Sequence, residues 1–125
     1  MNNTVVPLIG RILLAALFLI AAYNKVTNVA GTAGYFGKLG LPSPDILVWV
    51  VIAVEAIGGI FTVIGFQTRL VAWGMAIFTL LTALIGHKFW VDPSQMTNFL
   101  KNLSIMGGFL MLATAGPGRL SVDRR

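Results

Sequence analysis

The sequence of 125 residues contains no cysteine and a single histidine, His87. Without cysteine, the chain alone can form no disulfide, thiol nucleophile, iron–sulfur cluster or haem-thiolate ligand. A single histidine also excludes a bis-histidine haem and a multi-histidine metal site within one protomer, and we expect no metal. Redox chemistry would therefore need a bound organic cofactor or a partner protein, and the sequence reveals no independent catalytic machinery.

Charged residues are also scarce, at 10% of the chain, whereas hydrophobic residues make up 57%. A soluble domain carries roughly 25% charged residues, because a small domain is mostly surface. The composition therefore excludes a soluble globular fold, and it excludes a disordered chain as well. The net charge of +5 comes from basic residues scattered between apolar runs. This pattern is typical of membrane-protein orientation signals, and we expect no nucleic-acid partner.

Four apolar runs cover residues 5–26, 45–66, 69–87 and 95–115, and a basic tail follows over 116–125. Each run is about 20 residues long, roughly 30 Å as a helix, which matches a hydrocarbon core. The runs do not alternate between polar and apolar residues as barrel strands do. The sequence therefore predicts an all-α fold: an integral membrane four-helix bundle forming a single transmembrane domain.

The first connection is long and rich in glycine and proline, with Tyr35, Phe36 and Leu39 beside Lys38. This mixture predicts a short interfacial helix in the first loop. All five arginines fall on the side of the two termini and all four lysines on the other side. By the positive-inside rule we expect both termini to be cytoplasmic.

Runs two and four share a pattern of two glycines followed by an arginine. Gly59 precedes Arg69 by ten residues, and Gly108 precedes Arg119 by eleven. One interpretation is an internal repeat of two helical hairpins. The other is coincidence, because paired glycines and terminal arginines are common in spans.

Glu55 lies near the middle of the second run, about 13 Å from its outer end by the helical rise. A charge at this depth costs at least about 2.5–3.5 kcal/mol, so we expect the carboxyl group to face protein or water and to be protonated or paired. Lys101 is its predicted partner, about one and a half turns inside the fourth run. Arg11 lies near the end of the first run and is interpreted as snorkelling to the surface.

Other polar side chains gather in the same outer half. Asn98, Lys101 and Asn102 share one helix face by their spacing. Two interpretations stay open: an outward-facing polar pocket for a quinone-like or other small ligand or a proton route, and a purely structural set of hydrogen bonds. The candidate ligand-binding or proton-handling residues are Glu55, Lys101, Asn102, His87, Asn24, Lys25, Asn98 and Trp90.

Short motifs in order along the chain resemble those of the DoxX family of small four-span bacterial inner-membrane proteins. They are Gly10-Arg11-Ile12-Leu13, Tyr23-Asn24-Lys25, Leu39-Gly40-Leu41-Pro42, Glu55-Ala56-Ile57-Gly58-Gly59, His87-Lys88-Phe89-Trp90 and Gly116-Pro117-Gly118-Arg119-Leu120. The resemblance implies a multi-pass protein of the bacterial inner (plasma) membrane. It also implies a membrane subunit or accessory of a quinone-linked redox system, with quinone as the suggested cofactor, and it transfers no catalytic residue.

Two other functional hypotheses come from different classes. The first is a non-enzymatic membrane scaffold that recruits partner proteins, in which the basic tail matters more than Glu55. The second is a small proton-coupled transporter, suggested by a lone membrane carboxylate. The expected partners are the lipid bilayer, redox partner proteins and, in a homo-oligomer, further copies of the chain.

Overall fold

The computed structural model describes residues 4–124, and all of the regular elements in this range are helical. They are α1 (Val5–Val26), α2 (Val29–Lys38), α3 (Pro44–Ile64), α4 (Thr68–Gly86), the 3-10 turn η1 (Pro93–Gln95) and α5 (Met96–Ala115). The prediction of an all-α fold is confirmed. The four long helices begin and end within two residues of the apolar runs in the sequence.

Three of the described helices, α1, α3 and α4, are long and apolar enough to cross a membrane. The fourth long helix, α5, has 20 residues, but Asn98, Lys101 and Asn102 make its first half less apolar. Three of the four predicted spans therefore have the length and composition of membrane-crossing helices, and the four-span bundle stays a prediction.

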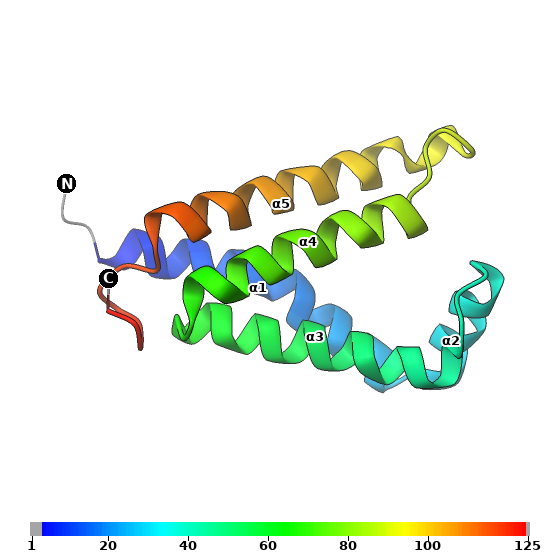
Figure 1. Cartoon of the computed structure of the whole chain (residues 1–125), viewed down its shortest axis with the longest axis horizontal. Coiled ribbons are helices and arrows are strands. Elements are labelled where there is room, and N and C mark those ends of the chain that lie inside the picture. Colours follow the sequence, from blue (N-terminus) through cyan, green and yellow to red (C-terminus); the bar gives the residue numbers. More distant parts are fainter. Residues whose placement is uncertain (1–3, 125) are drawn as a thin grey trace.

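The long helices run up and down and pair as two hairpins (Figure 1). α1 packs along α3 and α4 packs along α5, whereas contacts of α3 with α4 and of α1 with α5 are fewer. The start of α1 and the tail over 116–124 lie at one end, which we call the tail end. α2 and the α4–α5 connection lie at the other, the loop end. Hairpin pairing is the arrangement that an internal repeat requires, and the repeat itself stays a prediction.

The centre of the bundle is a small apolar core between the hairpins. Phe18 of α1 and Phe109 of α5 are buried with their ring centroids 5.7 Å apart, and Met75 and two alanines of α4 and Ala113 of α5 complete the cluster. Large apolar side chains on the outside are widely exposed, as expected where lipid replaces water. Gly58 lets α3 approach α4 closely, because a Cβ atom there would collide with the sulfur of Met75.

The short helix predicted in the first connection is present as α2. It begins after Asn28, whose side-chain oxygen accepts a hydrogen bond from the amide of Gly31, as is usual at a helix N-cap. Ala33 and Phe36 bury one face of α2 against Val48 and Ile52 of α3. This packing turns α2 across the loop end, and its position at a membrane interface stays a prediction.

Candidate functional site

Glu55 forms an ion pair with Lys25, which links the middle of α3 to the last turn of α1. Nζ of Lys25 lies 3.0 Å from Oε1 of Glu55. Glu55 is only 5% exposed, whereas Lys25 is half-buried and reaches the surface of a cavity. Among residues 4–124, no donor reaches Oε1 with hydrogen-bond geometry, so the contact is electrostatic. The expectation that Glu55 is paired is thus met by a different lysine from the one predicted.

The predicted partner, Lys101, is exposed on α5. It belongs to the α4–α5 hairpin, whereas Glu55 packs in the α1–α3 hairpin, and the backbones of α3 and α5 do not approach closely among the described residues. The predicted Glu55–Lys101 pair is therefore wrong. Helical spacing places Lys101 on a face of α5, but it cannot show which neighbouring helix that face meets.

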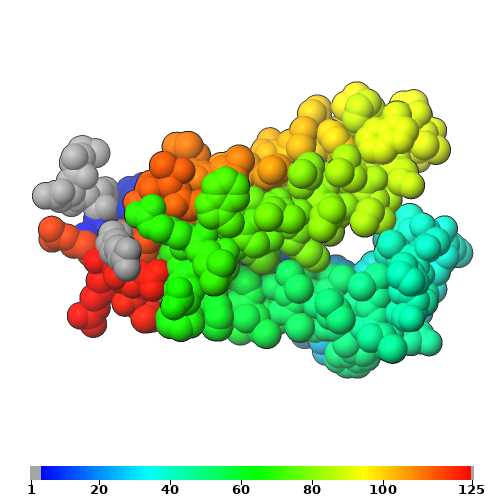
Figure 2. Space-filling model, in the orientation of Figure 1, coloured from blue at the N-terminus to red at the C-terminus, as the bar shows by residue number. Residues whose placement is uncertain are grey.

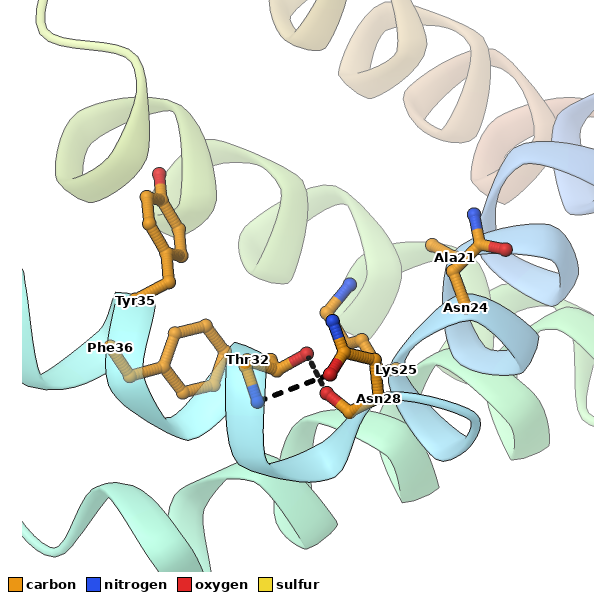
Figure 3. Close-up of a pocket in the computed structure, with 8 residues that line it drawn as sticks. Ala21, Asn24, Lys25, Asn28, Thr32, Tyr35 and Phe36 are labelled. Carbon is orange, nitrogen blue, oxygen red and sulfur yellow. Dashed lines mark hydrogen bonds between the residues drawn. The ribbon is translucent and has the colours of Figure 1, made fainter.

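A cavity of about 430 Å³ lies beside Lys25, at the loop end (Figure 3). It is lined by the last turn of α1, the turn that follows and α2: Ala21, Asn24, Lys25, Asn28, Gly31, Thr32, Tyr35 and Phe36. The hydroxyl group of Thr32 donates to the carbonyl of Asn28, which fixes it at the cavity wall. The cavity therefore joins one cation to several neutral polar groups and two aromatic rings.

The remaining predicted site residues lie on the α4–α5 hairpin. Nδ1 of His87 lies 3.0 Å from Oε1 of Gln95, which also accepts a hydrogen bond from Nδ2 of Asn98. Gln95 therefore links the end of α4 to the first turn of α5. Trp90 is 54% exposed and stacks edge-on with the neighbouring aromatic rings of Phe89 and Phe99. None of these residues lines the cavity at Lys25.

Asn102 is buried and serves as a link between helices. Its Nδ2 donates to the carbonyl of Thr79 and to the hydroxyl of Thr82, at 3.3 and 3.0 Å. Both partners belong to α4, so this amide ties α5 to α4. A purely structural role therefore accounts for both of the hydrogen bonds that the side chain of Asn102 donates to described residues.

The predicted site therefore divides in two. Glu55, Lys25 and Asn24 lie on the α1–α3 hairpin. His87, Asn98 and Asn102 lie on the α4–α5 hairpin. Sequence reasoning missed Thr32 and Tyr35, which approach Lys25 only because α2 folds back over the end of α1. Their signal was the aromatic, amphipathic character of the first connection, which was interpreted as a membrane contact alone.

Within residues 4–124, no three His, Asp or Glu side chains gather as a metal site requires.

Arg11 is buried at the tail end and is only 1% exposed, so the interpretation of a snorkelling side chain is wrong. Nη1 donates to the carbonyls of Thr62 and Val63 at the end of α3, and Nη2 donates to the carbonyl of Leu120. Carbonyls at a helix C-terminus lack partners within the helix and attract a cation. Arg11 therefore fastens the tail to the end of α3.

The tail makes further contacts around the α3–α4 turn. The carboxylate of Asp123 accepts hydrogen bonds from the amides of Gln67 and Thr68, at 3.0 and 2.7 Å, and so caps the start of α4. The amides of Val122 and Asp123 donate to the carbonyls of Ile64 and Gly65. No local pattern indicated this cap, because Asp123 lies 55 residues from Thr68 in the sequence.

A family model described as DoxX matches residues 6–88 of the chain. The inner membrane protein YphA of Escherichia coli (strain K12) is 41% identical over 97% of this chain and 90% of its own length. YqjF, an inner membrane protein of the same organism, is 43% identical over 94% of this chain and 88% of its own length.

A more distant relative is CatD of Bacillus subtilis (strain 168), which is named as a candidate oxidoreductase. It is 35% identical over 65% of this chain and 58% of its own length. No solved structure matches the chain. Because the family model covers more than half of the sequence and two relatives exceed 40% identity over nearly all of it, the chain belongs to the DoxX family.

Proposed function

We propose that this protein is a membrane subunit or accessory of a quinone-linked redox system in the bacterial inner membrane. The observation that supports this most is the Lys25–Glu55 ion pair at the border of the cavity of about 430 Å³. This volume falls in the usual range for small-molecule sites, roughly 300–1,000 Å³. The inner-membrane location follows from the names of the two similar E. coli proteins.

The chemistry of the cavity suits a neutral head group that accepts hydrogen bonds. An ammonium group carries three donors, and Glu55 lies next to only one side of Lys25. The hydroxyl groups of Thr32 and Tyr35 add further polar contacts, and the ring of Phe36 supplies an apolar wall. A quinone presents carbonyl oxygens on a flat apolar ring and so matches both kinds of lining.

The same pair can handle the protons that accompany quinone reduction. A carboxyl group and an amine in contact can pass a proton to a bound carbonyl oxygen when their geometry allows it. The chain contains no cysteine, so the electrons would be supplied by a bound organic cofactor or a partner protein. The oxidoreductase name of CatD supports a redox setting for the family.

We further propose that α5 is a fourth span and that both termini face the cytoplasm. At 20 residues α5 is about 30 Å long, enough to cross a hydrocarbon core. It packs along the whole of α4, and its one charged residue, Lys101, is exposed near the loop end, where it can reach the head groups. Arg11, Arg69 and Arg119 belong to the tail end, which supports a cytoplasmic position for that end.

Quinone binding can be measured on purified protein in lipid nanodiscs with a benzoquinone that carries only a short side chain. We expect a concentration-dependent rise in the melting temperature of the wild-type protein. Lys25→Met should weaken this binding at least tenfold in apparent Kd, because it removes the cation from the cavity wall. Glu55→Gln should weaken it as well, because Glu55 is the charged partner that holds Lys25 in place.

Lys88→Met serves as a matched control, because Lys88 is an exposed lysine at the same end, outside the cavity. It should leave the thermal shift unchanged. A wild-type protein whose melting temperature does not respond to the quinone would overturn the proposal. If redox partners still copurified with that protein, the scaffold hypothesis would gain support.

A further inference from the structure

The two hairpins separate toward the loop end. Figure 2 shows a crevice between α4 and the corner formed by α2 and α3. α3 and α4 meet closely at Gly58 and Met75, nearer the tail end, but α2 makes no backbone approach to α4 among the described residues. The crevice therefore lies between two helices that are each long and apolar enough to cross a membrane.

One side chain spans this crevice. Tyr35 extends from α2 toward α4 (Figure 3), and its hydroxyl oxygen lies 3.4 Å from the position that a Cβ atom of Gly86 would occupy. Tyr35 also lines the cavity beside Lys25. The same residue thus forms part of the cavity wall and the bridge between the hairpins.

We propose that the crevice is the lateral access route from the bilayer to the cavity, and that it holds the long hydrocarbon chain of an amphiphilic quinone whose head lies at Lys25. Tyr35 closes this route by its contact with Gly86. The inference rests on the proposed function and adds where the chain of the ligand runs, how it enters and which residue admits it.

The cavity and the crevice offer surroundings that match the two parts of such a ligand. The cavity provides polar contacts for a head group. The crevice runs between α3 and α4, which both have the length and composition of membrane-crossing helices, so an apolar chain can approach it sideways from the bilayer. A ligand that entered from water would have no need of a gap between two membrane helices. The contact between Tyr35 and a residue without a side chain is light, so swinging the ring aside breaks little packing.

The absence of cysteine allows a direct test, because two introduced thiols are the only ones in the protein. In Tyr35→Cys/Gly86→Cys, a cleavable crosslinker with two thiol-reactive groups, of about the length of a tyrosine side chain, would bridge α2 and α4. The association rates of two probes are then measured in nanodiscs: the short-chain benzoquinone and the same head group with a long isoprenoid chain.

We expect the crosslink to slow association of the long-chain probe at least tenfold and to leave the short-chain probe within twofold. Cleavage of the reagent should restore the rate, which shows that the protein stayed folded. Tyr35→Ala should speed association of the long-chain probe. Unchanged long-chain binding after crosslinking would overturn the access route alone, whereas failure of both probes to bind the wild-type protein would overturn the proposed function as well.

Discussion

Lys25 and Glu55 lie on different helices, 30 residues apart, yet their charged atoms approach to 3.0 Å. Each charge compensates the other at a depth where an isolated charge is costly. Because Lys25 also lines the cavity, the pair connects a buried carboxylate to a surface that a ligand can reach. Any change to one partner therefore acts on both stability and binding.

Lys25→Met should lower the free energy of unfolding by about 3 kcal/mol, because it leaves a buried carboxylate without its cation. The double variant Lys25→Met/Glu55→Gln should recover more than half of this loss, since no charge then remains buried. Both are measured by denaturant unfolding in detergent, as a double-mutant cycle. Additive losses in the double variant would show that the two side chains are not coupled.

Lys101→Met should leave both stability and the quinone-induced thermal shift unchanged, because Lys101 is exposed and lies on the other hairpin. Surface substitutions of this kind usually change stability by less than about 0.5 kcal/mol. The same unfolding and binding assays apply. A loss as large as that of Lys25→Met would restore Lys101 as the functional partner of Glu55.

Arg11→Met should release the tail from the bundle. The variant loses the donors to Val63 and Leu120, and hydrogen bonds to a charged group contribute about 1.5–3 kcal/mol each. We expect faster hydrogen exchange at the amides of Val122 and Asp123, with the α4–α5 hairpin unaffected. Unchanged exchange at these amides would mean that the other tail contacts suffice.

Asp123→Ala should lower stability by about 0.5–2 kcal/mol, the usual effect of removing a helix N-cap. The amides of Gln67 and Thr68 should become the first in α4 to exchange with solvent. Val122→Ala is the matched control in the tail, because the exposed side chain of Val122 is removed while its backbone hydrogen bond to Ile64 remains. Equal effects of both variants would contradict a specific role of the carboxylate.

Gly58→Val should lower stability by about 1–3 kcal/mol, as overpacked cores usually do, because its side chain would displace Met75. Gly107→Val on α5 is the control, since nothing lies within 4 Å of the Cβ position there. Thermal unfolding of the two variants separates a close helix contact from the general effect of replacing a helical glycine.

The turn before α5 should respond to acid. Hydrogen bonds from the hydroxyl and then the amide of Ser94 hold the pKa of Asp92 below its ordinary value. The turn is therefore favoured at pH values above the ordinary pKa of an aspartate and is lost as the pH falls through the lower pKa of the folded state. Faster exchange of the Ser94 amide in acid would show this, and Asp92→Asn should weaken the response.

The bounds of the long helices could be predicted from the sequence because apolar runs of membrane length leave the backbone few alternatives. The side-chain contacts between different helices could not be predicted from the sequence. Lys25 and Lys101 both lie near the loop end on helical faces, and only the hairpin packing brings Lys25 to Glu55. The partners of Arg11 could not be predicted either, because they are backbone carbonyls at the end of α3 and in the tail. No pattern of side chains in the sequence reveals such acceptors.

The contact between Arg11 and the carbonyl of Leu120 joins residues separated by 109 positions. During synthesis, α1 is therefore inserted long before its last partner has left the ribosome. The bundle can assemble its hairpins in order, but the tail end is completed only after translation has passed Asp123. A chain that stops before Leu120 would lack the acceptor of Nη2, and Arg11 would keep only the carbonyls of Thr62 and Val63 at the end of α3.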